Sequence, residues 1–430
     1  MGKFFFLSLL INLHCFVYTV EPFLEQNDYL NAAYIPLTPL PKWTEGDIQK
    51  LQNYYELHRE GYLDRMLGYI AASMGIIVHG HLSQEQLEEH LNQFDVQSID
   101  LADLQPGYLS NAACKLIQDS LLDVNRVYDI HLHNLGYDEG NYLNPKASVF
   151  GIAQSMDYFT FMVLRYAAGM SEPEGSTQEA RKRLQLYAMH FPKLCGIVLP
   201  IHKAILEDGT IDWENTGNYL KNRPALQTAL SFQSSISELL PAASVHPFDS
   251  KWEEKLVAAH EKGIRLIKWM PPQSIPPDSD LLDVYYEKLH QLGMTLIAHS
   301  GPEHAIPTNE GNLHWADWGN PLRFRKALEK GVDVILAHCG HRELIPDLDR
   351  EDDSQALGLD LFIRLAREAH QKNLSGEWTG KLFGDLAAVT NHYGPEFVKE
   401  LLLHVNEDGI RFIYGSDYPY TNLILSLIHI

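Results

Sequence analysis

The residues with the clearest chemical potential are two histidines one position apart, His131 and His133, within the sequence VYDIHLH. Successive side chains of a β-strand point to opposite faces, so both imidazoles of an extended segment lie on one face. Two imidazoles at that separation can bind one cation, and imidazole is the commonest metal ligand in proteins. An isolated His-x-His pair is weak evidence, so its meaning depends on the other polar residues of the chain.

Further polar residues stand near the carboxyl ends of other short apolar runs. They are His202, His246, Lys268, His299, His338, Asp385 and Asp417. Histidines that serve only the packing of a core would not be expected to collect at one end of successive runs. The sequence therefore predicts one shared site built from these positions.

The apolar runs alternate with amphipathic segments, and this alternation predicts parallel strands joined by helices. The runs are 127–133, 195–202, 243–248, 263–270, 294–300, 332–340, 382–389 and 411–419. Segments 252–263, 282–293 and 321–331 show helical spacing of apolar residues and end in glycine. Eight such strands match an α/β fold of the (β/α)8 TIM barrel type, in which the carboxyl ends of the strands form the active-site mouth. An open doubly wound sheet is the alternative, although the chain lacks the glycine-rich nucleotide-binding motifs of that architecture.

Composition excludes several classes of function. The 430 residues include 34 Lys and Arg against 56 Asp and Glu, for a formal net charge of −22. That balance argues against nucleic acid and anionic membrane surfaces as partners. A hydrophobic content of 45% supports a sizeable core, and four cysteines are too few for a disulfide-based fold.

The two ends of the chain carry expectations of their own. Residues 1–20 contain an apolar stretch that resembles a secretory signal or a membrane anchor. Asn12 and His14 interrupt it and no good cleavage site follows, so a cytoplasmic location is favoured over export. Residues 45–125 have helical periodicity and form an N-terminal extension to the predicted barrel at 126–430.

The carboxyl end departs from a complete barrel. The chain ends 13 residues after Asp417, and the final segment TNLILSLIHI is too short and too apolar for an amphipathic closing helix. We therefore expect a truncated barrel that lacks its closing helix. An uncovered flank of this kind predicts low solubility or the formation of a homo-oligomer.

Four motifs together resemble a known family. They are YDIHLH at 128–133, LIAHS at 296–300, ILAHCG at 335–340 and YGSDYP at 414–419. The order His-x-His, His, His, Asp is similar to that of the metal-dependent amidohydrolase superfamily. The AHCG and GSDYP forms look most like its amidohydrolase-related branch, which includes decarboxylases of the aminocarboxymuconate-semialdehyde type. The resemblance covers about residues 126–420.

This resemblance implies a metal centre with assigned roles. His131, His133, His299 and Asp417 would bind a divalent cation, with zinc the favoured ion. His338 would be a catalytic residue that contacts substrate or water, or a ligand of a second metal. Three imidazoles and one carboxylate suit Zn²⁺ and leave a position for water, whose pKa the ion lowers. Asp417 would then be both a ligand and the catalytic general base.

Four further residues keep alternative interpretations. In binuclear members of the superfamily a lysine at the position of Lys268 is carboxylated and bridges two metals. In the amidohydrolase-related branch it pairs instead with a substrate carboxylate or a nearby acid, and we favour a single metal. Simple packing of the lysine stem is also open. His202 and His246 are candidates for substrate or second-metal contacts, or hydrogen-bonded structural histidines, and Asp385 supports the site or packs beneath it.

The predicted function is that of a metal-dependent hydrolase of amidohydrolase type, which cleaves a C–N or C–O bond of a small molecule. The alternative is a metal-dependent, non-oxidative decarboxylase of an unsaturated or aromatic acid, which would use the same site. A third hypothesis is a non-catalytic binding protein on the same barrel. The motifs alone do not separate the first two hypotheses, because both need the same ligands.

Overall fold

The computed structural model describes the part of the chain that contains the predicted site. The described residues are 127–134, 184, 194–217, 238–273, 275–303, 318–352, 354–389, 397, 400, 401, 403, 404 and 407–417. The predicted signal or anchor at 1–20, the helical extension at 45–125 and the final segment after Asp417 lie outside them.

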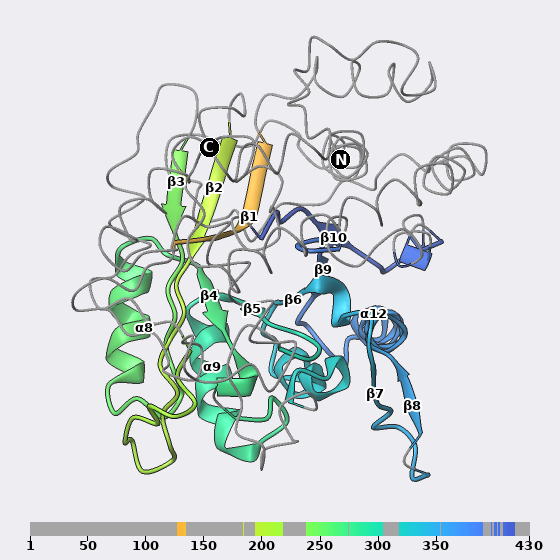
Figure 1. Ribbon diagram of the computed structural model, residues 1–430, viewed down its shortest axis with the longest axis horizontal. Helices are drawn as coiled ribbons and strands as arrows, with labels where there is room; N and C mark the ends of the chain where they lie inside the picture. The colour runs from red at the N-terminus through yellow and green to blue at the C-terminus, as the bar shows by residue number, and fades with distance from the viewer. Residues whose placement is uncertain are drawn as a thin grey trace, which may run out of the picture.

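The described strands form two parallel sheets and one hairpin (Figure 1). The smaller sheet has the order β1 (Val127–His133), β2 (Leu194–Leu199), β3 (Glu238–Pro241). The larger has the order β10 (Phe412–Ile413), β9 (Leu382–Asp385), β6 (Val334–Ala337), β5 (Thr295–Ala298), β4 (Leu266–Trp269). Every pair in these two sheets is parallel. The fold is therefore of the α/β class, as the sequence predicted.

Backbone hydrogen bonds connect both edges of the smaller sheet to the larger one. Ala243, just after β3, forms a parallel bridge to Ile267 of β4, and Lys268 N–H donates to the carbonyl of Ala243 at 2.8 Å. At the other edge Ile130 N–H of β1 donates to the carbonyl of Tyr414, just after β10, at 3.2 Å. The first and last described strands therefore lie next to each other.

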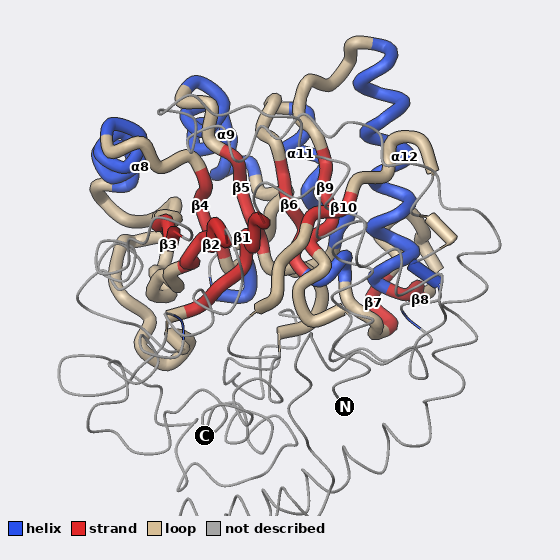
Figure 2. Tube along the Cα trace, turned by 90° about the horizontal axis from the view of Figure 1, so that it is seen from above, coloured by secondary structure: helices blue, strands red, loops and turns tan. Residues whose placement is uncertain are grey.

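Helices cover the side of the larger sheet that faces away from β1–β3 (Figure 2). They are α8 (Trp252–Glu261), α9 (Asp283–Gln291), α11 (Arg325–Glu329) and α12 (Gly358–Ser375), with short 3-10 turns η4 (Pro271–Gln273), η5 (Asp280–Leu282), η6 (Pro321–Phe324) and η7 (His338–Gly340). The helices α8, α9 and α11 fall within the three segments where the sequence predicted them. Gly263 and Gly331, which follow α8 and α11, have φ of 85° and 80°, a conformation that glycine adopts without strain.

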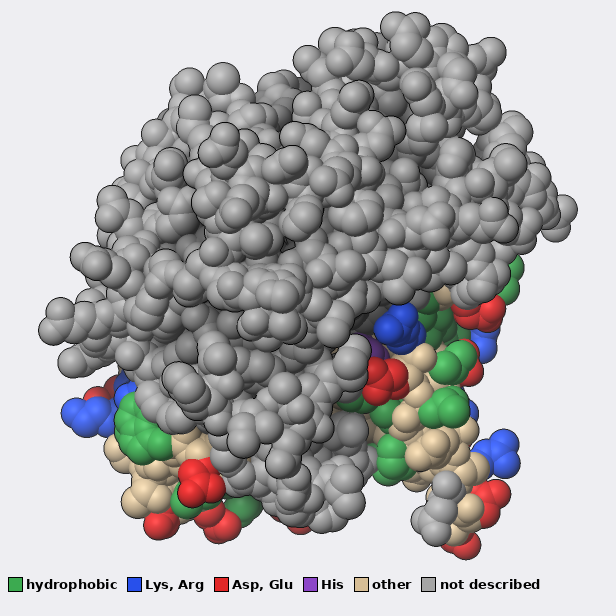
Figure 3. Space-filling model, in the orientation of Figure 1, with side chains coloured by type: hydrophobic (Ala, Val, Ile, Leu, Met, Phe, Trp, Pro, Cys, Tyr) green, Lys and Arg blue, Asp and Glu red, His purple; other side chains and the backbone are tan. Residues whose placement is uncertain are grey.

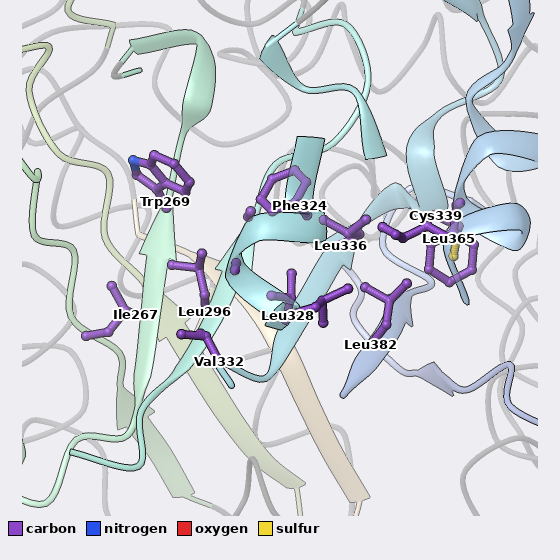
Figure 4. Close-up of a cluster of buried hydrophobic side chains, with 14 of the residues drawn as sticks. Ile267, Trp269, Leu296, Phe324, Leu328, Val332, Leu336, Cys339, Leu365 and Leu382 are labelled. Carbon is purple, nitrogen blue, oxygen red and sulfur yellow. The ribbon is translucent and has the colours of Figure 1, made fainter. Parts of the chain in front are cut away.

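Buried apolar side chains form two separate clusters. The larger lies between the strands and the helices and includes Trp269, Leu296, Leu336 and Phe324 (Figure 4). The smaller takes a side chain from each parallel strand or from the residue next to it. Its members are Ile130, Ile197, Leu199, Ala242, Leu266, Ile297, Ile335 and Phe383, with Ile413 against them. The strands are therefore apolar on both faces, as parallel strands covered on both sides are.

Two elements differ from the sequence prediction. The third strand was expected at 243–248, but β3 ends at Pro241, and after it the described residues up to 248 make only the bridge at Ala243. The antiparallel hairpin of β7 (Leu344–Pro346) and β8 (Gln355–Leu357) was not predicted. Its exposed residues alternate with buried Ile345, so it lacks the continuous apolar run of the other strands.

The described surface carries charges of both signs. In Figure 3 acidic, basic and hydrophobic side chains are interspersed on the coloured part of the molecule. Ion pairs such as Arg325 with Asp349 at 2.7 Å and Arg364 with Asp347 at 2.6 Å connect some of them. Among the described helices, none has both the length and the apolar character needed to cross a bilayer.

Candidate metal centre

The centre begins with the histidine pair of β1. A β-bulge shifts the register with β2 between Asp129 and Leu132. Ile130 belongs to the smaller apolar cluster and Leu132 to the larger one, although in a regular strand they would share a face. The bulge therefore changes the direction in which the side chains of this segment point. His131 and His133 remain on one face, both buried, with their Nε2 atoms 3.0 Å apart.

Asp417 joins this pair from the other end of the chain. Its Oδ1 lies 3.2 Å from Nε2 of His133 and 3.5 Å from Nε2 of His131. Within the described residues, these three side chains form the one group of buried potential ligands whose binding atoms all lie within 4.8 Å of one another. Burial favours the neutral acid, but the hydrogen bond from His133 and nearby positive charges outweigh it and hold the pKa of Asp417 below its usual value. A carboxylate is therefore present at neutral pH.

Asp385, at the end of β9, forms a hydrogen bond with the Nδ1 side of the His131 ring. Its Oδ2 contacts Nδ1 of His131 in a short hydrogen bond, and its Oδ1 accepts from the N–H of Ala387 at 2.9 Å. Burial, and then the charge of Lys268, lower the pKa of His131, so its ring is neutral near pH 7. Burial also raises the pKa of Asp385, and in its ionised form Asp385 accepts the single ring proton of His131 from Nδ1. The lone pair of Nε2 then points toward His133 and Asp417. This arrangement of carboxylate and imidazole is the one that orients histidine ligands in metal sites.

Gly415 leaves the space in which Asp385 and His131 come close to this part of the backbone. A Cβ atom on Gly415 would overlap Oδ1 of Asp385 and would lie 2.6 Å from Cβ of His131. The GSD motif that ends at Asp417 thus needs a residue without a side chain at its first position.

Lys268 of β4 enters the same cluster. Only 1% of the residue is exposed, and its Nζ lies 3.1 Å from Nε2 of His131. Burial lowers the pKa of Lys268, while the acids Asp417, Asp385 and Glu303 oppose that shift. The structure therefore brings Lys268 to the predicted site, which excludes an outward-pointing amine. The choice between a substrate contact and a bridging role stays a prediction.

His338 lies beside the histidine pair at the end of β6. It has a positive φ of 64°, and its Nδ1 donates to the carbonyl of Ala387 at 2.9 Å. Its ring centroid lies 5.6 Å from that of His131. Burial lowers the pKa of His338 to about 4, so the ring is neutral near pH 7 with Nε2 deprotonated. That state suits contact with a ligand or with substrate, and the catalytic role stays a prediction.

His299 lies on the far side of His338. The two ring centroids are 5.0 Å apart. Its Nδ1 is 3.3 Å from a carboxylate oxygen of Glu303, and its Nε2 is 3.2 Å from the carbonyl of Pro302. Both nitrogens face oxygen atoms of its own loop rather than the histidine pair. Binding of the same cation would require this ring to turn, so the fourth ligand stays a prediction.

His202 and His246, in the segments that follow β2 and β3, form a separate pair with ring centroids 5.1 Å apart. His202 donates from Nδ1 to the carbonyl of Lys203 at 2.9 Å and accepts at Nε2 from Met270 N–H at 3.1 Å. His246 accepts at Nδ1 from Phe248 N–H at 3.0 Å, and its Nε2 lies 3.3 Å from a backbone carbonyl. Any ligand role for either residue would therefore require the loss of backbone hydrogen bonds.

Two supporting residues were not found by sequence analysis. Asp129 is fully buried within β1, and Ser300, next to His299, is fully buried as well. Ser300 Oγ donates to the carbonyl of Ala337 and accepts from Gly340 N–H, so it ties the ends of β5 and β6 together. A signal existed for Asp129, because an acid inside an apolar strand must find partners when it is buried.

Comparisons with known proteins give little beyond this geometry. No family model matches the chain, and no curated protein matches it. The solved structures that resemble it include two of proteins provisionally assigned as 2-pyrone-4,6-dicarboxylic acid hydrolases. The one from Pseudomonas putida is 17% identical, with a TM-score of 0.36, over 69% of this chain and 83% of that one. The one from Acinetobacter baumannii, with citric acid bound, is 14% identical, with a TM-score of 0.35, over 69% and 85%.

Proposed function

We propose that this chain is a metal-dependent hydrolase that cleaves a C–N or C–O bond of a small molecule. One divalent cation, with zinc the favoured ion, would be held by His131, His133 and Asp417, with His299 as the fourth residue of the set. Lys268 and His338 would line the same site. The proposal rests on the chemistry of the donor atoms on β1 and after β10.

The observation that carries this proposal is the close approach of two imidazole nitrogens. With the ring proton of His131 on Nδ1, toward Asp385, its Nε2 presents a lone pair toward Nε2 of His133, 3.0 Å away. A cation that replaced the Nε2 proton of His133, which donates to Asp417 in its absence, would accept both lone pairs and the carboxylate of Asp417 at once. Two histidines and one acid are a donor set that Zn²⁺ accepts in catalytic sites. The residues present therefore fit a metal ion.

The residues around such an ion have separable tasks. A bound divalent ion supplies Lewis acidity and lowers the pKa of a water molecule toward neutrality. Asp417 accepts the proton of the attacking water at its carboxylate, as a general base. Asp385 keeps the proton of His131 on Nδ1. His338 and Lys268 are placed to contact the substrate, and the neutral His338 ring can accept a hydrogen bond at Nε2.

The architecture proposed for this site is one closed (β/α)8 barrel. Two facts support closure: hydrogen bonds connect both edges of the smaller sheet to the larger one, and the smaller apolar cluster draws on all eight parallel strands. In a closed barrel the carboxyl ends of β1, β4, β6, β9 and β10 would converge on one mouth. The open sheet that the sequence also allowed would not bring β1 beside β10.

The first experiment measures metal and activity on the same sample. The full chain is purified without chelator, its metal content is determined by mass spectrometry, and amides, cyclic amides, lactones and carboxylic acids are screened as substrates. His133→Ala removes one predicted ligand, and His260→Gln on α8 is the matched control outside the site.

The proposal predicts about one metal per chain in the wild type and in His260→Gln, and much less in His133→Ala. It also predicts consumption of water rather than release of CO₂ from an active substrate. A stoichiometry near two that falls on Lys268→Ala would contradict the single-metal assignment. A wild-type chain that holds no metal and takes up none would refute the proposed function and favour a binding protein.

A further inference from the structure

The candidate metal centre is assembled from the two ends of the described chain. His131 and His133 come from the first described strand, and Asp417 from the residues after the last. They meet along the seam between β1 and β10. In addition to the hydrogen bond from Ile130 to Tyr414, Asp417 N–H donates to the carbonyl of His131 at 2.8 Å. The alignment of this seam decides how far the carboxylate lies from the imidazoles.

One buried side chain bridges the seam. Asp129 is fully buried, and its Oδ1 accepts from His131 N–H at 3.1 Å and from Ser416 N–H at 3.0 Å. Asp129 and Ser416 lie 287 positions apart in the sequence. One of its two donors belongs to a candidate ligand, and the other immediately precedes Asp417.

The backbone at both ends of this bridge is irregular. His131 lies in the β-bulge, where the ladder with β2 is interrupted. Asp417 has a φ of 58°, in the left-handed region that residues other than glycine rarely adopt. Such a conformation persists when the surrounding structure holds it in place. A side-chain oxygen that accepts two backbone N–H groups ties the two segments to one point.

We propose that Asp129 is a positioning residue, which holds the bulge of β1 and the turn before Asp417 in register so that the candidate ligands converge on one ion. It acts through two backbone hydrogen bonds and does not touch the ion. The expected effect of Asp129 on metal affinity rests on the proposed function. Its expected effect on the hydrogen bonds between β1 and the residues after β10 does not.

The test uses two variants of Asp129 and one matched control. Asp129→Ala removes the acceptor, and Asp129→Asn keeps an acceptor oxygen at the same place. The control is Asp333→Ala. Asp333 precedes β6, and its Oδ1 accepts from Lys381 N–H at 2.8 Å, so it is also a carboxylate that ties two neighbouring strands through the backbone. It lies at the opposite ends of the strands from the site.

Two measurements are made on each full-length protein: amide hydrogen exchange over 129–134 and 412–417, and zinc affinity by competition with a chromophoric chelator. We expect exchange at His131 and Ser416 to accelerate about tenfold or more in Asp129→Ala, because each N–H group loses its acceptor. Zinc affinity should fall about tenfold or more, as it does when groups that orient ligands are removed. Asp129→Asn and Asp333→Ala should bind zinc within about threefold of the wild type.

Unchanged exchange at both amides in Asp129→Ala would overturn the proposal. Equal losses of affinity in Asp129→Asn and Asp129→Ala would also overturn it, because they would show that the charge matters and the hydrogen bonds do not. If Asp129→Ala does not fold, Asp129→Asn still decides, because a loss of zinc affinity of about tenfold or more in that variant would overturn the proposal. A wild type without zinc affinity would refute the proposed function alone, and the exchange data would still decide the role of Asp129.

Discussion

Protonation of His202 should destabilise the folded protein by a calculable amount. Its Nδ1 donates to the carbonyl of Lys203 and its Nε2 accepts from the N–H of Met270, so only the neutral ring satisfies both bonds. Burial lowers the pKa of His202 from 6.5 to about 4, with a smaller contribution from the charge of Lys268 and an opposing one from the Lys203 bond. Between these two values the unfolded chain binds a proton that the folded protein does not. The free energy of unfolding therefore decreases as the pH falls through this window.

The size of the effect follows from the two pKa values. Each pKa unit corresponds to about 1.4 kcal/mol, and between about pH 7 and pH 5 His202 should cost nearly 2 kcal/mol of stability. Most side-chain carboxylates remain ionised over this range, which limits other contributions. His202→Gln removes the titrating group. The variant should therefore lose about 2 kcal/mol less than the wild type over the same pH change.

The assay is urea unfolding of both proteins at several pH values, with His290→Gln as the control because His290 is an exposed histidine of α9. The control should follow the wild type. If wild type and His202→Gln lose stability in parallel as the pH falls, the neutral hydrogen-bonded state assigned to His202 is wrong. A stability that rises as the pH falls would contradict the sign of the effect.

Three other predictions concern the site and the core. Asp417→Asn removes the general base, so kcat on an identified substrate should fall by about 10²-fold or more while circular dichroism shows an intact fold; near-normal turnover would contradict its role. Asp385→Ala should weaken zinc binding by about 10–100-fold through loss of the proton acceptor of His131, as measured by chelator competition, and unchanged affinity would contradict this. Leu296→Ala removes a fully buried side chain of the larger cluster, and urea unfolding should show a loss of about 2–5 kcal/mol; a loss below about 1 kcal/mol would mean that this part of the core collapses around the cavity.

Much of the fold could be predicted because parallel strands covered on both faces are continuous apolar runs. The expected strand at 127–133 coincides with β1, and the run at 382–389 contains β9. The third strand could not be placed correctly, because SVHPF continues the apolar pattern after the ladder has ended at Pro241. The hairpin of β7 and β8 gives no such pattern, since it lies mostly on the surface.

The site was predictable in its residue types and less so in its geometry. The His-x-His spacing predicts that the two imidazoles meet, and their Nε2 atoms do lie 3.0 Å apart. The bulge that re-aims them could not be predicted, because it appears only in the register between β1 and β2. The same holds for His299, whose loop carbonyl at Pro302 and acid at Glu303 lie within a few residues of it and occupy its ring nitrogens. Local contacts of this kind cannot be recognised from a pattern of residue types in the sequence.

The most direct test of the central claim is a crystal structure of the zinc-soaked protein with anomalous scattering measured at the zinc edge. We predict one strong peak within about 2.0–2.3 Å of Nε2 of His131, Nε2 of His133 and a carboxylate oxygen of Asp417. The same crystals of His133→Ala should lose that peak. A peak elsewhere in the molecule, or none after soaking, would contradict the assignment of these three residues as a metal centre.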